Sequence, residues 1–160
     1  MRKATLGAAL AALAIVLAAC GGGNDQGSSA SATTAAAQQA SQPGTVAVAS
    51  TGLGEVLVDG KGRTLYAFTK DKGDQSVCSG KCAAAWPALT VTGAPTPGAG
   101  VQASLLSTAK QANGSTQVTY GGKPLYYFAG DTAPGDTKGQ GLNGVWWVVR
   151  GDGSLVQTKG

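Results

Sequence analysis

The chain has 160 residues, 42% of them hydrophobic, and its 12 Lys and Arg against 8 Asp and Glu give a net charge of +4. The cations are spread singly along the sequence, which argues against a nucleic-acid partner, because such proteins gather Lys and Arg on one face or in one run. There is no His, and the only Met is Met1, so the commonest general base and the imidazole and thioether metal ligands are missing. The composition therefore predicts neither a metal nor a cofactor.

The N-terminus has the pattern of a secretory signal. Arg2 and Lys3 precede an uncharged run of Ala, Leu, Ile and Val that ends at Leu17-Ala18-Ala19-Cys20. This run is too short and wrongly flanked for a membrane-spanning helix, and small residues before a cleavage point are typical of a signal peptide. We therefore predict that residues 1–19 are removed as a signal peptide.

A cysteine at the cleavage point makes this segment resemble the lipobox of bacterial lipoprotein signals. The resemblance implies that Cys20 becomes the acylated, palmitate-bearing first residue of the mature chain. Because each buried acyl methylene contributes roughly 0.8 kcal/mol, two or three chains hold a protein on a membrane essentially permanently. We therefore expect an extracytoplasmic protein, lipid-anchored to a bacterial cell membrane through Cys20.

The segment 20–45 begins with this cysteine and continues with small, polar and nearly uncharged residues. This composition predicts a flexible tether.

The remaining residues, 46–160, suffice for one domain with its own core. Shifting this segment against itself by 60 positions brings matching residues into one frame without a gap, which predicts an internal duplication. We place repeat 1 at 46–105 and repeat 2 at 106–160. The matching pairs are Gly54 and Gly114, Val58 and Val118, Gly62 and Gly122, Leu65 and Leu125, Tyr66 and Tyr126, Phe68 and Phe128, Asp71 and Asp131, and Trp86 and Trp146.

Repeat 1 has the pattern of a β-meander. Strands are expected at 46–49, 55–58 and 64–68, and Asp59-Gly60 between the last two is a strong hairpin signal. A short helical turn is expected near 79–86, because three consecutive alanines favour helix and Pro87 cannot continue it.

Repeat 2 follows the same plan, with strands expected at 105–109, 116–120 and 125–128. In both repeats a fourth strand is expected to begin near the shared Trp. The run 145–149 is apolar on both faces, which predicts a central position, and Asp152-Gly153 offers a last hairpin to 154–157. With eight or nine short strands in two meander units of about 60 residues, we expect an all-β fold, a small sandwich or barrel.

Each repeat carries one copy of the pattern Tyr-x-Phe-x-x-Asp, at 66–71 and at 126–131. Together with the lipobox, the segment Cys78 to Pro87 and the run Gly144-Val145-Trp146-Trp147, these motifs resemble the bacterial secreted-repeat lipoproteins, a family of predicted lipoproteins defined by a Y-x-[FWY]-x-x-D motif. The resemblance covers nearly all of residues 46–150. It implies an envelope lipoprotein of unknown function and supplies no catalytic residues.

The motif residues have two interpretations. On a strand Tyr66 and Phe68 share a face by the period of two, and the Asp falls just past the strand end. The structural interpretation is that the rings fill the core and each Asp accepts backbone N–H bonds in a turn. The alternative is a groove that binds a sugar or a peptide by stacking and hydrogen bonding. Its candidate lining is Tyr66, Phe68, Asp71, Trp86, Tyr126, Phe128, Asp131 and Trp146.

Cys78 and Cys82 are the thiols that remain once Cys20 is acylated. An even number of cysteines in an exported protein predicts a structural disulfide. A redox dithiol is the second interpretation, although the spacing is not Cys-x-x-Cys. A soft metal such as copper is the third, and its site would be incomplete without a histidine.

No pairing of a nucleophile with a base is visible, so the leading hypothesis is a non-enzymatic, lipid-anchored envelope module that binds or supports an envelope polymer or protein. The first alternative is a redox or metal-handling protein that uses Cys78 and Cys82. The second is a carboxylate-based enzyme, which requires Asp71 and Asp131 to converge within roughly 5 to 10 Å.

Overall fold

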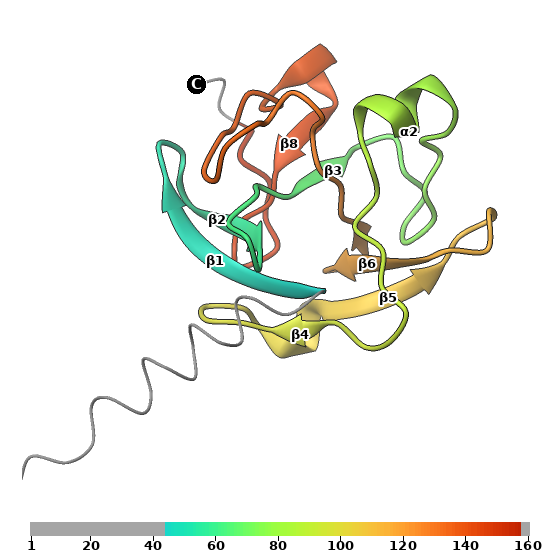
Figure 1. Ribbon diagram of the computed structural model, residues 1–160, viewed down its shortest axis with the longest axis horizontal. Helices are drawn as coiled ribbons and strands as arrows, with labels where there is room; N and C mark the ends of the chain where they lie inside the picture. The colour runs from blue at the N-terminus through green and yellow to red at the C-terminus, as the bar shows by residue number, and fades with distance from the viewer. Residues whose placement is uncertain (1–43, 158–160) are drawn as a thin grey trace, which may run out of the picture.

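Short strands and their turns make up most of the described chain, which in this computed structural model comprises residues 44–157 (Figure 1). The predicted signal peptide, Cys20 and nearly all of the tether lie outside the described residues. None of the helices within 44–157 has the length and apolar character that crossing a bilayer requires.

The strands form three small sheets that pack as a sandwich, and the prediction of an all-β fold is confirmed. In the first sheet β1 (Thr45–Thr51) pairs antiparallel with β2 (Gly54–Asp59) and parallel with β4 (Thr96–Pro97). The second has the antiparallel order β5 (Leu106–Lys110), β6 (Thr116–Tyr120) and β7 (Lys123–Pro124). The third pairs β3 (Tyr66–Phe68) with β8 (Trp146–Val148), one strand from each repeat.

The helical content is small. α2 (Lys81–Ala85) occupies the stretch where the alanines and Pro87 predicted a helical turn, and two 3-10 turns, η1 (Ala103–Leu105) and η2 (Leu142–Gly144), precede β5 and β8. α2 and η2 occupy equivalent places in the two repeats. The Ala85 carbonyl at the end of α2 accepts the N–H of Ala129 in repeat 2, and the Val145 carbonyl after η2 accepts the N–H of Thr69 in repeat 1, each at 2.9 Å.

The turn after β2 is built by Asp59, as the Asp-Gly signal predicted. One carboxylate oxygen of Asp59 accepts the backbone N–H groups of Lys61 and Arg63 at 2.8 and 2.9 Å. Gly62 in this turn has a φ of +80°, which glycine adopts without steric cost.

The duplication is visible in the pairing of the strands, but one part of the ungapped frame is wrong. Val46 pairs with Asp59, whereas its counterpart Leu106 pairs with Tyr120, a partner one position further along. Across β6 the offset between the repeats is therefore 61 residues, and Leu57 rather than Val58 corresponds to Val118. The original frame returns at Leu125, because the connection after β6 is one residue shorter than the one after β2.

Some expected strands form only single bridges. Around Tyr126 the chain bridges Tyr66 on one side and Ala88 on the other, and the last hairpin is reduced to a bridge between Val149 and Leu155. The two-residue strands β4 and β7 were not predicted. Pro97 and Pro124, which lack a donor N–H, limit how far these strands can pair.

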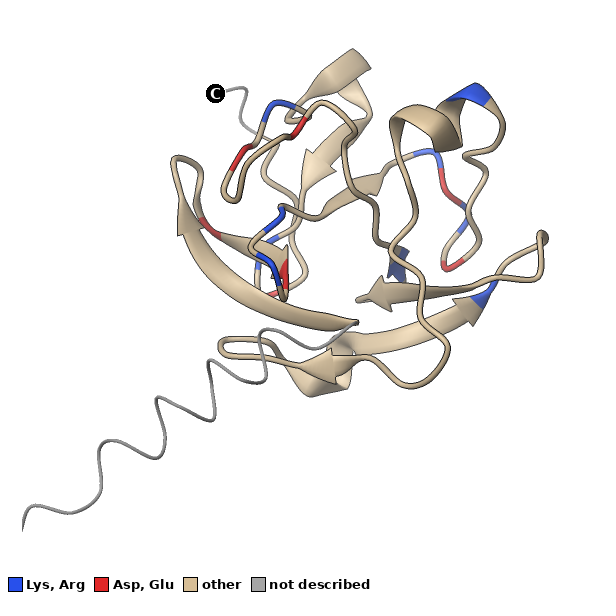
Figure 2. Ribbon diagram, in the orientation of Figure 1, with Lys and Arg blue, Asp and Glu red and all other residues tan. Residues whose placement is uncertain are grey.

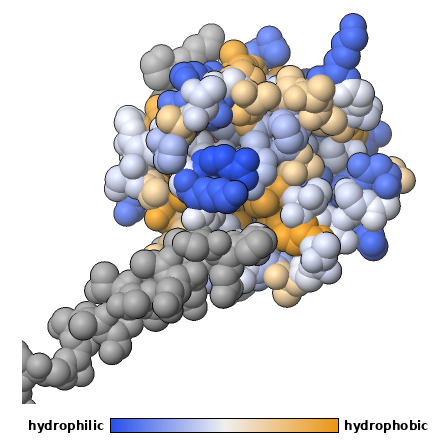
Figure 3. Space-filling view, in the orientation of Figure 1, coloured by the Kyte–Doolittle hydropathy of each residue, from blue (hydrophilic) through white to orange (hydrophobic). Residues whose placement is uncertain are grey.

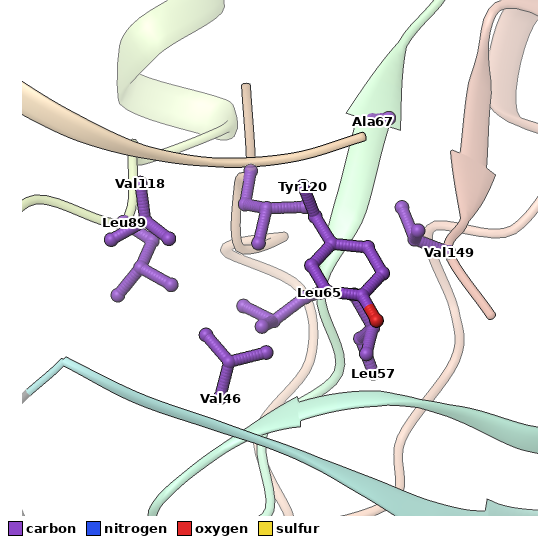
Figure 4. Packing of buried hydrophobic residues seen from close by; sticks show 9 residues of the cluster. Val46, Leu57, Leu65, Ala67, Leu89, Val118, Tyr120 and Val149 are labelled. Atoms are coloured by element: carbon purple, nitrogen blue, oxygen red, sulfur yellow. The ribbon is translucent and has the colours of Figure 1, made fainter. Parts of the chain in front are cut away.

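The core consists of two adjoining clusters that share strands. One cluster is aliphatic apart from Tyr120, and its side chains converge on a common interior (Figure 4). It contains Val46, Leu57, Leu65, Ala67, Leu89, Val118, Tyr120, Leu125 and Val149. The other cluster, called the aromatic cluster here, combines aliphatic residues with Tyr66, Trp86, Tyr126 and Trp146, and the motif Phe side chains pack against it. β8 contributes to the aromatic cluster and the next residue, Val149, to the aliphatic one, so residues 146–149 are buried, although β8 pairs with β3 alone in a two-stranded sheet.

Candidate functional site

The two motif tyrosines bind the two motif aspartates crosswise. The Tyr66 hydroxyl donates a hydrogen bond to Oδ2 of Asp131 at 2.6 Å, and the Tyr126 hydroxyl donates one to Oδ2 of Asp71 at 2.7 Å. The backbones of the two tyrosines also bond to each other in both directions at 2.9 Å, forming an antiparallel bridge. Each repeat therefore supplies the hydroxyl for the other repeat's carboxylate.

The second oxygen of each carboxylate closes the loop that follows it. Oδ1 of Asp71 accepts the Val77 N–H and Oδ1 of Asp131 accepts the Lys138 N–H, both at 2.9 Å. The backbone N–H groups of both aspartates bond back to the carbonyl of the motif Phe in their own repeat at 3.1 Å. The carboxylates thus join a local turn to a distant strand.

Four rings form a stack in which the repeats alternate: Phe68, Trp146, Trp86 and Phe128. The centroid separations along it are 4.3, 3.8 and 4.6 Å, and the two indole planes at its centre differ by only 4°. Tyr66 meets Trp86 edge-on at 5.3 Å, and Tyr126 meets Trp146 in the same way at 5.2 Å. The flanking edge-on contacts are a geometry that aromatic pairs prefer.

Burial controls the electrostatics of the crosswise pairs. Burial raises the pKa values of the Tyr66 and Tyr126 hydroxyls well above the ordinary value for tyrosine. The carboxylates to which these hydroxyls donate raise the two pKa values further. Burial also raises the pKa of Asp71 and Asp131, while the hydrogen bonds they accept oppose that shift. The phenols are therefore held protonated as donors.

The two indoles at the centre of the stack are buried. Trp86 and Trp146 are only 5% and 3% exposed, and both faces of each indole are covered by other rings. The large hydrophobic residues that are exposed among residues 44–157 are Val77 and Leu142, and the face in Figure 3 mixes hydrophilic and hydrophobic residues in small patches. The structure places Tyr66 and Tyr126 in the core, whereas the motif Phe and Asp side chains are half-buried.

The two motif aspartates lie in different loops. Figure 1 shows the loop 69–80 and the loop 130–141 on opposite sides of β3 and β8, and each carboxylate is bonded to a tyrosine. Acidic and basic residues are interspersed along the loops (Figure 2). In the second of these loops Lys138 contacts Asp136 at 2.8 Å and lowers the pKa of that carboxyl to about 2.

Cys78 and Cys82 form a disulfide with a Cα to Cα distance of 5.3 Å, which confirms the predicted bridge. Both cysteines pack against the aromatic cluster. The loop before the bridge is bonded to repeat 2, because the Tyr126 hydroxyl contacts Oγ of Ser76 at 2.6 Å and Ser76 N–H donates to the Gln111 side chain at 2.9 Å. In the disulfide neither sulfur is a free thiolate.

Sequence reasoning missed a polar cluster around Asp59. Oδ2 of this buried carboxylate accepts two bonds from the Arg63 guanidinium, at 2.7 and 2.9 Å, and one from the Tyr127 hydroxyl at 3.1 Å. The guanidinium carbon lies 3.8 Å from the Tyr127 ring centroid, a cation–π contact. The Asp-to-Arg spacing of four residues was the available signal. Without the fold it did not point to Tyr127, which lies in the other repeat.

Comparison with known proteins gives one family. Its model, described as a secreted repeat of unknown function, matches the chain at residues 47–90 and 107–150, which is just over half of the sequence. The search of curated proteins and the search of solved structures found no match. The two matched segments fall on the two repeats, and the family description implies an extracytoplasmic location. The chain belongs to this family of secreted repeats of unknown function and carries two copies of the repeat.

Proposed function

We propose that this protein is a lipid-anchored, non-enzymatic module of the bacterial cell envelope, which presents a rigid duplicated β-domain to an envelope polymer or protein. Cys20 attaches the protein to the membrane, and the small polar residues after it form a tether between the membrane and the domain. The rigid domain is then held close to the membrane without being embedded in it.

The observation that carries this proposal is the crosswise pairing of the motif. The polar groups of the motif are already bonded to each other: the Tyr66 hydroxyl to Asp131 and the Tyr126 hydroxyl to Asp71. A general acid or base must reach its substrate within hydrogen-bond distance, whereas these groups bond within the fold. Their chemistry stabilises the domain, which favours a binding or supporting role over catalysis.

Membrane fractionation of the full chain tests the anchor. The wild-type chain is expected in the membrane fraction, resistant to high salt and released by detergent, with an acylated Cys20 in the mass spectrum of its N-terminal peptide. Cys20→Ala is expected to release a folded protein, because the acyl chains provide the attachment.

The matched control is the double variant Cys78→Ser and Cys82→Ser, which also removes cysteines and is expected to stay with the membrane. If Cys20→Ala remains with the membrane, or if the mature N-terminal peptide carries no acyl chain, the proposed anchor is wrong.

A further inference from the structure

A cavity of about 160 Å³ lies between the disulfide loop and the loop that joins β5 to β6. Ser76, Cys78 and the edge of Trp86 border it from repeat 1, and Gln111, Gln117 and Tyr126 border it from repeat 2. This space is large enough for several waters. It suits one small ligand group.

The polar groups of this cavity are held in place by the fold. Gln117 and Tyr126 are each 1% exposed, and Gln117 donates to the Leu125 carbonyl at 2.9 Å. Gln111 accepts the Ser76 N–H and donates to the Asp74 carbonyl at 3.0 Å. Pre-positioned polar groups in a small cavity are how ligand sites fix orientation.

Two departures from the internal duplication meet at this cavity. The disulfide occurs only in repeat 1, because the equivalent positions of repeat 2, 138 and 142, hold Lys and Leu. The connection between the paired strands is longer in repeat 2, because the Gln111 N–H bonds to the Ser115 carbonyl across residues 112–114, whereas Thr51 pairs with Gly54 across only residues 52–53. The parts that differ between otherwise similar halves form the two walls of one site.

The chemistry of the walls selects the class of ligand. Every residue that the described chain contributes to the lining is uncharged, and the groups offered are hydroxyls, carboxamides and small apolar surfaces such as Ala83 and Ala88. A charged ligand would lose its hydration without an opposite charge to replace it. Apart from its bonds to Asp74 and Ser76, the Gln111 carboxamide has a second N–H and a second carbonyl lone pair, which complement the carbonyl and the N–H of an acetamido group.

We propose that this cavity binds the acetamido group and adjoining ring edge of a neutral N-acetylated sugar, as a residue of an envelope polysaccharide. The choice of polysaccharide rests on the envelope location given under the proposed function. The cavity itself does not depend on the lipid anchor.

Nuclear magnetic resonance titration of the full chain carrying Cys20→Ala with N-acetylglucosamine tests the site. Shifts are expected in the indole N–H of Trp86 and the side-chain amides of Gln111 and Gln117. Glucose, which lacks the acetamido group, is expected to bind at least about tenfold more weakly. Absence of shifts at millimolar sugar, shifts confined to another surface, or equal binding of glucose would each overturn the proposal.

Two neighbouring alanines of α2 provide a matched pair of variants. Ala83 lines the cavity and Ala84 does not, and both are exposed. Ala83→Phe is expected to weaken sugar binding at least about tenfold by filling the space, whereas Ala84→Phe should stay within about twofold. Equal effects of the two variants would contradict the assignment.

Failure of this site and failure of the anchor give different results. A chain that stays on the membrane through Cys20 but shows no sugar shifts overturns only the sugar site. A chain that binds the sugar but is not acylated overturns only the anchored location.

Discussion

Tyr66 and Asp131 are joined by a 2.6 Å hydrogen bond across 65 positions of the sequence, and the motif thereby connects the two repeats as well as closing a local loop. Tyr126 and Asp71 repeat this connection in the opposite sense. The most direct tests of the fold concern these pairs.

Tyr66→Phe removes a bond to a charged acceptor and is expected to lower the free energy of unfolding by about 1.5 to 3 kcal/mol. Tyr120→Phe is the matched comparison, because Tyr120 is equally buried but donates to the neutral carbonyl of Gly151, so about 1 kcal/mol is expected there. Urea unfolding measures both. A smaller loss for Tyr66→Phe than for Tyr120→Phe would contradict the charged bond.

A double-mutant cycle isolates the pair itself. Combining Tyr66→Phe with Asp131→Asn is expected to give a coupling of about 1 kcal/mol or more, because both variants break the same contact. Combining Tyr66→Phe with Asp152→Asn, a change at an exposed turn in which the carboxylate bonds only locally, should be additive. Additivity in both cycles would show that the crosswise bond does not stabilise the fold.

Removing either central indole is expected to be costly. Trp86→Ala and Trp146→Ala each open a space in the ring stack, and loss of a buried aromatic side chain costs about 3 to 5 kcal/mol. Because the two residues occupy equivalent places, the losses should be similar. Thermal unfolding checks this, and a near-neutral effect of one of them would show that the stack is not a shared core.

The buried phenols predict an alkaline limit to stability. The folded pKa values of Tyr66, Tyr126 and Tyr127 are raised by burial, whereas the unfolded chain ionises near pH 10. Their contribution is thus complete below about pH 10 and is lost as the pH rises above it towards the folded values. The melting temperature should fall steeply above pH 10, together with the 295 nm rise of ionised tyrosine. Reversible ionisation of every tyrosine in the folded protein near pH 10 would contradict this.

The disulfide is expected to contribute modestly. It closes a loop of only five residues, 78–82, for which the chain-entropy model gives about 2 kcal/mol. The double variant Cys78→Ser and Cys82→Ser should therefore melt at a lower temperature yet keep its β-sheet circular dichroism. Complete unfolding would assign the bridge a larger role than loop closure.

The local parts of the site could be predicted from residue patterns. The spacing of Tyr66 and Phe68 indicates one face of a strand, and an Asp after a strand indicates a turn. Which tyrosine binds which aspartate could not be predicted, because a period of two fixes a face and not a partner 65 residues away. A match of Tyr66 with its own Asp71 would have satisfied the same pattern.

The shift of β6 was hidden for a related reason. Repeat 2 has one residue more than repeat 1 before β6 and one residue fewer after it, and the two changes cancel. Identities outside this stretch, such as Leu65 with Leu125, therefore suggested one ungapped alignment of the repeats. Buried polar residues such as Gln111 and Gln117 have no sequence signature either, since their partners are backbone groups of distant loops.

The alternation of repeats in the ring stack affects how the chain matures. Synthesis delivers repeat 1 first, and Tyr66, Phe68 and Trp86 then have no Asp131, Trp146 or Phe128 to contact. Contacts between segments so far apart are slow to form and assemble cooperatively. During this interval the first repeat exposes its aromatic side chains, which makes the half-made chain a substrate for chaperones and proteases until the second repeat arrives.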